Sequence, residues 1–334
     1  MITTDHYLSY DIDRKVILFQ ENIEKKIYPA SITKLMTALI LYENTQLDDI
    51  VKISYPPDYL FEGKVAYLDT GTELSVEQLI EFLLVFSAND IAYATAIFIS
   101  DSVDEFVVLM NNKAKKLNMN NTNFVNPDGL DQPNHYTTLK DLLILSEYIL
   151  ENTKMIDITN KSKFYFDDNG VVKEFKNTNL LINNGFKGLK TGWTSNAGLT
   201  FVGYNQNNNR NILTIVNKSL VDENKESHFS DTVILYRESI NNFKKNIVAL
   251  ESDKLYRIVS PYDTNYYYFE YDIIKFGNVN IKNEINLLQI NMDGIQISDN
   301  YDNKILEINL PQPNKYIRYN FLKSNVISRL VPSN

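Results

Sequence analysis

The chain has 334 residues, of which 44% are hydrophobic and 22% are charged, and its formal net charge at pH 7 is −9. This composition excludes a mostly disordered chain, and the excess of acidic over basic residues argues against a broad nucleic-acid-binding surface. No stretch of the sequence is apolar for long enough to predict a membrane-spanning helix. The absence of cysteine excludes disulfides, thiolate catalysis and cysteine-based zinc sites.

The first half of the chain predicts a strand pair followed by helices. Residues 7–20 are typical of two short strands around a polar turn at Asp11–Lys15. The segment 121–137 is dense in Asn, Asp, Pro and Gly and predicts a loop. The helical spacing of apolar residues, with a capping box at Ser75–Gln78, predicts helices in the remainder of this half. These helices cover about Ser31–Glu43, Ser75–Phe86, Asp90–Ser100, 103–117 and 138–152.

The second half predicts an antiparallel sheet. From about residue 163 the hydrophobic period changes towards two, which is typical of strands. Residues 188–194, 199–204 and 211–217 predict neighbouring strands, and residues 229–243 predict a helix. Chain-adjacent strands with short connections pair antiparallel, which excludes a doubly wound dinucleotide-binding fold. We therefore expect an α/β (α+β) fold in which helices flank an antiparallel sheet.

The texture of the sequence changes after about residue 245, where short β-rich runs alternate with spacers rich in Asn and Asp. We therefore divide the chain into a domain of residues 1–245 and a small C-terminal β-rich domain of residues 246–334. After Glu307 the chain has basic residues and no acidic one. Peripheral association with a membrane surface is one interpretation of this tail, and an ordinary strand and tail is the simpler one. The basic residues are Lys315, Arg318, Lys323 and Arg329.

Two short motifs at helix ends could carry chemistry. Ser31 and Lys34 lie one helical turn apart at a predicted helix start, so the amine can reach the hydroxyl and act as its base. Ser87 and Asn89 lie at a break between two predicted helices, where side chains can point into a cleft. Taken alone, each motif has a simpler explanation, because serine and asparagine commonly cap helices and most lysines are solvated.

A third motif lies on a predicted strand. Gly192 permits close approach of a ligand to the backbone, and the preceding Lys190 and Thr191 could bind an anion. Alone, the simpler explanation is a solvated lysine on an edge strand. The three motifs nevertheless occur in one order, each on the kind of element that its role demands. A closely related set marks β-lactamases and penicillin-binding proteins.

The flanking residues resemble the low-molecular-mass penicillin-binding proteins, which are serine-type D-alanyl-D-alanine carboxypeptidases. Residues 28–37, Tyr-Pro-Ala-Ser-Ile-Thr-Lys-Leu-Met-Thr, are similar to the first motif of that family, and residues 87–90, Ser-Ala-Asn-Asp, to the second. Residues 188–194, Gly-Leu-Lys-Thr-Gly-Trp-Thr, are similar to the third motif, and residues 124–131 to the loop that precedes it. The resemblance covers about residues 5–244.

The resemblance implies a β-lactamase-like transpeptidase fold and a catalytic role for four residues. Ser31 would attack the carbonyl between the two terminal D-alanines of a peptidoglycan stem peptide, with Lys34 as its general base. Ser87 would relay a proton to the leaving amine, and Asn89 would hold both Lys34 and the substrate amide.

The same resemblance implies a substrate-binding role for the third motif. Lys190 and Thr191 would bind the terminal carboxylate of the substrate, and Gly192 would let the substrate approach the strand. The backbone N–H groups of Trp193 and Ser31 would form the oxyanion hole. The indole ring of Trp193 has no role in this scheme. Two lysines in one cleft would disfavour each other's charged form and help to keep Lys34 basic.

The partners implied are a stem peptide ending in D-Ala-D-Ala and β-lactam antibiotics, with no cofactor, no metal and no nucleic acid. The family acts in the cell envelope, outside the cytoplasmic membrane. The opening residues MITTDHYLSYD have no features of a signal peptide, so we expect a mature chain from which that segment has been removed.

Two histidines and two aspartates need separate interpretation. His135 lies in the Asn-rich loop, where we expect it to pack or bond locally. His228 lies near the place where some relatives carry an arginine that helps to bind the substrate carboxylate, and a mostly neutral histidine there would weaken turnover. Asp128 and Asp131 are expected to form turns rather than to act as catalytic acids.

Two other functions remain as alternatives. One is a β-lactam sensor or peptidoglycan-binding module that is acylated without turnover. The other is a β-lactamase of the same fold, which is disfavoured because residues 121–137 contain no Glu-x-x-Leu-Asn segment to supply a deacylating glutamate.

Overall fold

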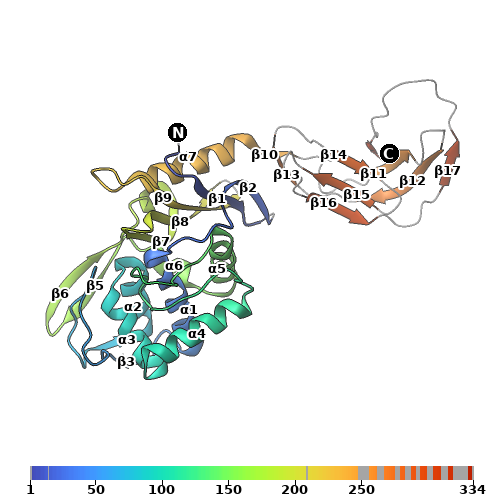
Figure 1. The fold of residues 1–334 in the computed structure, drawn as a ribbon. Helices are drawn as coiled ribbons and strands as arrows, with labels where there is room; N and C mark the ends of the chain where they lie inside the picture. Colours follow the sequence, from blue (N-terminus) through green and yellow to red (C-terminus); the bar gives the residue numbers. More distant parts are fainter. Residues whose placement is uncertain are drawn as a thin grey trace. The chain divides into compact units, whose positions relative to one another are not determined.

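The computed structural model describes residues 2–13, 15–207 and 210–246 and, beyond them, short strands between residues 256 and 332. The chain divides into two compact units (Figure 1). The first unit consists of Met1–Asp13 with Leu18–Tyr236, and the second of Arg14–Ile17 with Arg237–Asn334. Each unit is described below by itself. The domain boundary expected between residues 245 and 246 stays a proposal.

The first unit is built on a five-stranded sheet with the strand order β2-β1-β9-β8-β7. Its strands are β1 His6–Asp11, β2 Val16–Glu21, β7 Phe186–Thr194, β8 Gly198–Asn207 and β9 Arg210–Ser219. β1 pairs with β9, β9 with β8 and β8 with β7, and all three pairings are antiparallel. The predicted antiparallel sheet is confirmed, and β7, which carries the third motif, lies at its edge.

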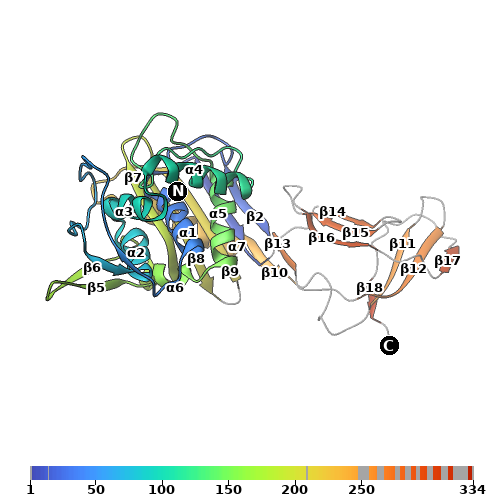
Figure 2. The ribbon, with the colours of Figure 1, turned by 90° about the horizontal axis from the view of Figure 1, so that it is seen from below.

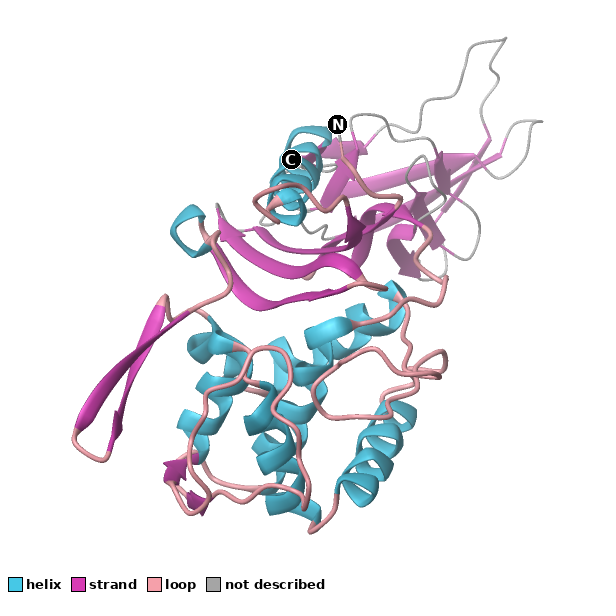
Figure 3. Ribbon diagram, turned by 60° about the vertical axis from the view of Figure 1, so that its left-hand side comes forward, coloured by secondary structure: helices cyan, strands magenta, loops and turns pink. Residues whose placement is uncertain are grey.

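Helices lie on both sides of this sheet (Figure 3). On one side α7 packs through Phe229 and Leu235 onto Phe186, Phe201 and Val216 of the strands. The larger layer on the other side contains α1 to α6 (Figure 1). The helical elements are η1 Ala30–Thr33, α1 Lys34–Asn44, α2 Val76–Ile80, η2 Glu81–Phe86, α3 Asn89–Ser100, α4 Val103–Lys116, α5 Leu139–Asn152, α6 Met155–Thr159, η3 Ile182–Asn184 and α7 Ser227–Asn242.

Helix α1 lies in the midst of the helical layer (Figure 2). The side chains from Lys34 to Leu41 are all buried, so this helix presents no solvated face over two turns. A helix that is apolar nearly all round belongs in a protein core. The first motif therefore starts a helix that the rest of the domain holds on all sides.

The structure differs from the predicted helices in two local details. The first turn of the Ser31 helix is a 3-10 helix, which is common at helix ends. The predicted capping box at Ser75 and Gln78 is present, but the helix continues from Glu81 to Phe86 as a π-helix. π-Helical turns are rare and are frequently found at functional sites.

Several short elements were not predicted, because they are too short to show a period. They are α6 and the strands β3 Ile50–Lys52 and β4 Glu73–Ser75, which pair with each other. The hairpin of β5 Lys163–Asp168 and β6 Val171–Lys176 begins where the sequence period changes towards two.

Beyond the end of α7 at Asn242, the elements that the structure describes in the second unit are strands, as predicted for the C-terminal part. A four-stranded sheet has the order β17-β12-β11-β18, a three-stranded sheet the order β14-β15-β16, and β10 pairs with β13. Lys323 and Arg329 of the basic tail lie outside the described residues. Among the helices that the structure describes, none has the length and apolarity needed to cross a bilayer. The strands are β10 Phe243–Asn246, β11 Tyr256–Pro261, β12 Tyr267–Ile274, β13 Val279–Lys282, β14 Leu287–Ile290, β15 Gly294–Ser298, β16 Lys304–Asn309, β17 Lys315–Arg318 and β18 Leu330–Pro332.

Candidate active site

Lys34 connects the first two motifs. Its Nζ lies 3.0 Å from Ser31 Oγ and donates to Asn89 Oδ1 at 2.6 Å and to the backbone oxygen of Asp128 at 2.7 Å. Ser31 belongs to η1 and Lys34 is the first residue of α1, so the turn between the two helices sets their spacing. The structure therefore brings the predicted nucleophile, base and positioning amide into contact.

Burial lowers the pKa of Lys34 to about 8 from its ordinary value of 10.5. Its side chain is fully buried, and removal of water penalises the charged amine. The nearby carboxylates of Asp128 and Asp90 act against this shift, and the charge of Lys64 adds to it. A lysine with this pKa has a neutral fraction of about one-tenth at pH 7, so it can accept a proton.

The second motif lies at the junction of η2 and α3. Ser87 has φ 74°, in the left-handed region, and Asn89 begins α3. Non-glycine residues rarely adopt this conformation, and those that do are frequent at functional sites. The Asn89 amide is fixed at both ends, because its Nδ2 donates to the backbone oxygen of Glu62 at 2.8 Å while Oδ1 accepts from Lys34.

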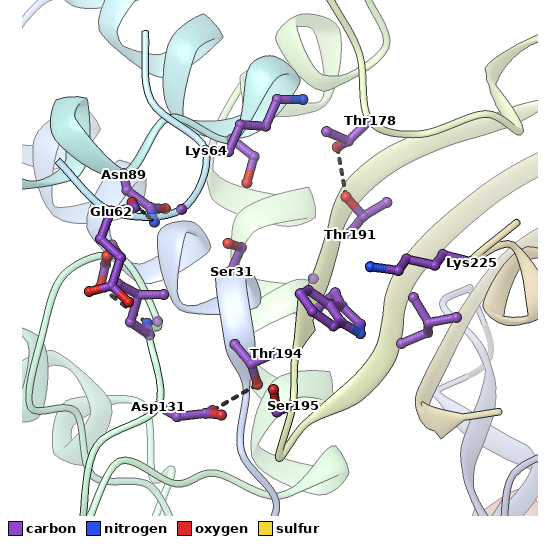
Figure 4. A pocket seen from close by; sticks show the side chains of 18 of the residues that line it. Ser31, Glu62, Lys64, Asn89, Asp131, Thr178, Thr191, Thr194, Ser195 and Lys225 are labelled. Carbon is purple, nitrogen blue, oxygen red and sulfur yellow. Dashed lines mark hydrogen bonds between the residues drawn. The ribbon is translucent and has the colours of Figure 1, made fainter. Parts of the chain in front are cut away.

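The third motif lies on β7, directly beside η1. Lys190 is 1% exposed, so it is not the solvated edge-strand lysine of the simpler explanation. Burial, with the charges of Lys34 and Lys64, places its pKa well below the ordinary value. The hydroxyl of Thr191 donates to Thr178 Oγ1 at 2.6 Å (Figure 4).

Gly192 is required by the contact between β7 and η1. A Cβ atom at this position would lie 3.1 Å from Ser31 N, 3.0 Å from Ala30 Cβ and 2.8 Å from Thr200 Cγ2. Any side chain there would push the strand away from the serine. The backbone of the following residue, Trp193, is placed by the same strand.

The indole of Trp193 contacts the side chain of Lys225. It is 46% exposed, and Lys225 Nζ lies 3.9 Å from the centre of its ring. This distance is within the range of a cation–π interaction. Lys225 was not singled out by the sequence, because no local motif marks it.

The loop of residues 121–137 packs under the first motif. Gly129 has φ +93°, and a Cβ atom there would lie 1.9 Å from the backbone oxygen of Ala30. Asp128 forms the expected turn by accepting from Leu130 N at 3.2 Å. Asp131 has a further contact that the sequence did not predict: it ties the loop to the end of β7, because it accepts from Thr194 Oγ1 at 2.7 Å and from the backbone N–H of Asn196 at 3.1 Å (Figure 4).

Both histidines near the site are buried. His135 Nδ1 accepts from Val125 N at 3.0 Å, and Nε2 lies 2.9 Å from Thr33 Oγ1, so this ring bonds locally as expected. His228 lies near the start of α7 and is 4% exposed. Burial lowers the pKa of each ring to about 4, so both are neutral at pH 7.

One cavity of about 1290 Å³ lies among these elements, and Lys34, Lys190 and His135 are not among the residues that line it. Its lining includes members of all three motifs, namely Ser31, Ser87, Asn89, Thr191, Gly192 and Trp193. Residues that no motif marked also line it: Tyr59, Glu62, Lys64, Tyr93, Thr178, Lys225 and His228. Within the described part of the chain, no group of three or more His, Asp or Glu side chains could hold a metal ion.

Known proteins are similar to this chain in sequence. Residues 1–219 match the family model described as D-alanyl-D-alanine carboxypeptidase. The chain is 32% identical over 212 residues to the D-alanyl-D-alanine carboxypeptidase DacF of Bacillus subtilis, covering 61% of this chain and 54% of the relative. It is 31% identical over 229 residues to DacA of Haemophilus influenzae, covering 64% and 57%. The match thus spans about half the length of these curated relatives.

Solved structures show the same fold. Penicillin-binding protein D2 of Listeria monocytogenes, in its cefotaxime-bound form, has a TM-score of 0.63 and 28% identity, and the match covers 72% of this chain and 98% of that one. The D-alanyl-D-alanine carboxypeptidase DacD of Francisella tularensis has a TM-score of 0.75 and 19% identity over 96% of this chain and 95% of that one. The second similarity supports the fold alone.

Proposed function

The chain belongs to the D-alanyl-D-alanine carboxypeptidase family of serine peptidases, as its motifs predict, and we propose that it removes the terminal D-alanine from peptidoglycan stem pentapeptides. The observation that carries this proposal is the contact of Lys34 Nζ with Ser31 Oγ at 3.0 Å, in a cluster of hydrogen-bonded polar side chains. We place the reaction outside the cytoplasmic membrane, where the family acts on the cell wall, and assign it to a catalytic domain of residues 1–245.

Acylation begins at Ser31. Its Oγ attacks the carbonyl carbon between the two D-alanines while its proton passes to the neutral Nζ of Lys34. The oxyanion that forms accepts hydrogen bonds from the backbone N–H groups of Ser31 and Trp193, and such donors stabilise the transition state by about 2.7–4 kcal/mol each. The carbon–nitrogen bond then breaks, and Ser87 relays a proton to the leaving amine.

Deacylation restores the serine. A water molecule gives a proton to the same base and attacks the ester, the Ser31 oxygen leaves and is reprotonated, and the shortened peptide is released as a carboxylic acid. Lysine suits both steps, because its lowered pKa lets it take and return a proton near neutral pH.

Substrate recognition is assigned to β7. Lys190 and Thr191 bind the terminal carboxylate, which limits the reaction to peptides with a free C-terminus. The lack of a side chain at Gly192 lets β7 lie directly against η1, which keeps the backbone of the strand beside Ser31. β-Lactams are proposed to acylate Ser31 in the same way, which is supported by the cefotaxime-bound form of the Listeria monocytogenes relative.

One observation favours a second candidate, a β-lactam sensor that is acylated without turnover. His228 lies in the cavity wall and is neutral, so it adds no positive charge for the substrate carboxylate. If weak carboxylate binding abolishes peptide turnover, penicillin would still acylate Ser31.

The test is release of D-alanine from a stem pentapeptide ending in D-Ala-D-Ala, by the full chain and by Ser31→Ala. Ser195→Ala is the matched control, because Ser195 is an exposed serine in the lining of the same cavity (Figure 4). Release that is lost only in Ser31→Ala supports the carboxypeptidase. No release from a chain that still binds penicillin covalently at Ser31 favours the sensor.

A further inference from the structure

A group of aromatic rings extends outward from the wall of the cavity. Tyr59 and Tyr93 line the cavity, and their ring centroids lie 4.6 Å apart. The rings of Tyr55 and Phe61 contact that of Tyr59, and Phe61 also stacks on Tyr67 with centroids 5.8 Å apart. We call these five residues the aromatic platform. The proposed reaction uses none of them.

The outer end of the platform is open to solvent. Tyr67 is 68% exposed and Phe61 is 46% exposed, and the adjacent Leu60 is exposed as well. At this exposure most of the Tyr67 ring is accessible to a ligand. Globular proteins rarely expose several large apolar side chains side by side, and patches of this kind mark binding surfaces.

The backbone fixes Tyr67 in this exposed position. Its φ is 56°, in the left-handed region that bulky residues rarely adopt. The buried carboxylate of Asp90 holds this conformation, because Oδ2 accepts from Tyr67 N at 2.9 Å and from Ala66 N at 3.0 Å. Backbone conformations of this kind cost free energy and are concentrated at functional and ligand-binding sites. Such a cost at an exposed aromatic residue indicates that the ring has a use there.

The segment that carries the platform is tied to the second motif. Asn89 Nδ2 donates to the backbone oxygen of Glu62 at 2.8 Å, and Asn89 N donates to that of Lys64 at 2.7 Å. Asp90, the next residue of the motif, holds Tyr67. The platform is therefore fixed relative to the asparagine that is proposed to hold the substrate amide.

The platform lies on the side of the cavity towards which the substrate continues. The terminal carboxylate is assigned to β7, and Figure 4 shows Thr191 of β7 and Glu62 on opposite sides of Ser31. A peptide with its carboxylate on β7 and its scissile carbonyl at Ser31 thus continues towards the segment that contains Tyr59 and Glu62. The four residues that precede the scissile bond span about 13 Å when extended, which is comparable with the width of a cavity of about 1290 Å³. The group attached to the first of these residues therefore emerges beside the platform.

We propose that the aromatic platform binds a sugar ring of the glycan strand to which the stem peptide is attached. The inference rests on the proposed function, because that substrate is a peptide joined at its N-terminus to N-acetylated amino sugars. The faces of such a sugar ring carry C–H groups, which pack against the negative face of an aromatic ring, while its hydroxyl and amide groups lie around the edge and stay in water.

A lipid surface fits the platform less well than a sugar. Asp58, Glu62 and Asp69 lie in or beside the same segment and are exposed, so an anionic membrane would be repelled. Uncharged sugar rings meet no such repulsion, and their polar edges can bond to these carboxylates.

The test measures binding by the full chain with Ser31→Ala, so that no ligand is cleaved. Isothermal titration calorimetry compares the free stem pentapeptide, the same pentapeptide attached to its disaccharide, and a β-linked N-acetylglucosamine tetramer without peptide. We expect the disaccharide-linked peptide to bind about threefold to tenfold more tightly than the free peptide, which corresponds to one stacked pair of rings. The tetramer should bind more weakly than either and at the same platform.

Three variants of this chain locate the effect. Tyr67→Asn should abolish both the advantage of the disaccharide and the binding of the tetramer, and asparagine tolerates the left-handed backbone, so the bond to Asp90 is kept. Tyr67→Phe retains the ring and should retain the advantage. Tyr165→Ala is the matched control, because it removes an exposed tyrosine of the β5–β6 hairpin that does not line the cavity.

Several results would overturn the inference. They are equal affinity of the free and the disaccharide-linked peptide, an advantage that Tyr67→Asn retains, or no binding of any ligand. Binding to phosphatidylglycerol vesicles that Tyr67→Asn abolishes, without an effect of the sugar, would assign the platform to a membrane surface. Release of D-alanine from the free pentapeptide by the unmodified chain tests the proposed function separately, so the two failures can be distinguished.

Discussion

The backbone of Gly192 lies so close to Ser31 that a Cβ atom added to the glycine would be 3.1 Å from Ser31 N. That nitrogen is one of the two donors assigned to the oxyanion hole. The edge strand β7 and the helical turn η1, which are far apart in the sequence, are therefore in direct contact at Gly192 and Ser31. The strand can lie this close to the nucleophile only because Gly192 has no side chain.

Gly192→Ala should therefore reduce acylation strongly. The methyl group also meets Ala30 and Thr200, so the strand must move away from the serine. Loss of one oxyanion donor corresponds to a rate reduction of about 100-fold or more. The measurement is the second-order rate of penicillin acylation, with thermal unfolding followed in parallel.

Gly170→Ala separates this effect from general strain. Gly170 has φ +85°, yet a Cβ atom there would meet nothing within 4 Å. This variant should lose stability and keep its acylation rate. If Gly192→Ala acylates at the unmodified rate, the assigned position of the oxyanion hole is wrong.

The pH dependence of acylation should report Lys34. A general base acts in its neutral form, and its pKa is about 8, so the rate should rise with pH, reach half its maximum near pH 8 and level off above. Lys34→Arg should be inactive over this range, because guanidinium does not lose its proton. A profile that is flat from pH 6 to 10 would contradict the role of Lys34 as base.

The increase of the acylation rate with pH should not depend on His228. The ring is neutral throughout this pH range because its pKa is about 4. His228→Gln should consequently leave the midpoint near pH 8 unchanged, even if its rate differs. A midpoint that moves by a full pH unit in this variant would show that the histidine takes part in proton transfer.

Asp131 should position the substrate through the end of β7. Asp131→Ala removes acceptors for Thr194 and Asn196, and each lost hydrogen bond costs about 0.5–1.5 kcal/mol. We expect a several-fold rise in KM for the peptide with a smaller change in kcat. Gln132→Ala, the exposed neighbour in the same cavity, is the control. Equal KM values in both variants would exclude a positioning role.

The sequence predicted the candidate catalytic residues that lie in short motifs. Ser31 and Lys34 are close in the chain, so helical spacing alone predicted their contact. The hydrophobic period and the short connections between strands predicted the sheet and its helical layer. Local patterns could not predict burial. The sequence around Lys190 is equally compatible with a solvated lysine on an edge strand, but the fold leaves Lys190 only 1% exposed.

Other members of the site come from segments without any motif. Glu62 and Lys64 precede a stretch with no clear period, and Lys225 lies in a polar loop, yet all three line the cavity. Asp131 looked like a turn residue because it follows Asn, Pro and Gly. Its partner Thr194 is 63 positions further along, and no local rule relates residues at that separation.

His135 should make the domain sensitive to acid. Its pKa is about 4 when folded and about 6.5 when unfolded, so the unfolded chain binds the extra proton between these values. The contribution of His135 to the free energy of unfolding is therefore fully present above pH 6.5 and is lost as the pH falls towards 4. From pH 7 to pH 5 the expected loss from this ring is about 2 kcal/mol.

His135→Gln should remove that part of the loss, and denaturant unfolding of both chains at pH 7 and pH 5 measures the difference. Glutamine can still accept from Val125 N, so the variant should fold, although it is less stable than the unmodified chain at pH 7. The informative quantity is the change between the two pH values, because other titrating groups contribute equally to both chains. His228, whose pKa is lowered in the same way, keeps its own contribution in the variant. If both chains lose the same free energy, His135 is already accessible to protons in the folded state.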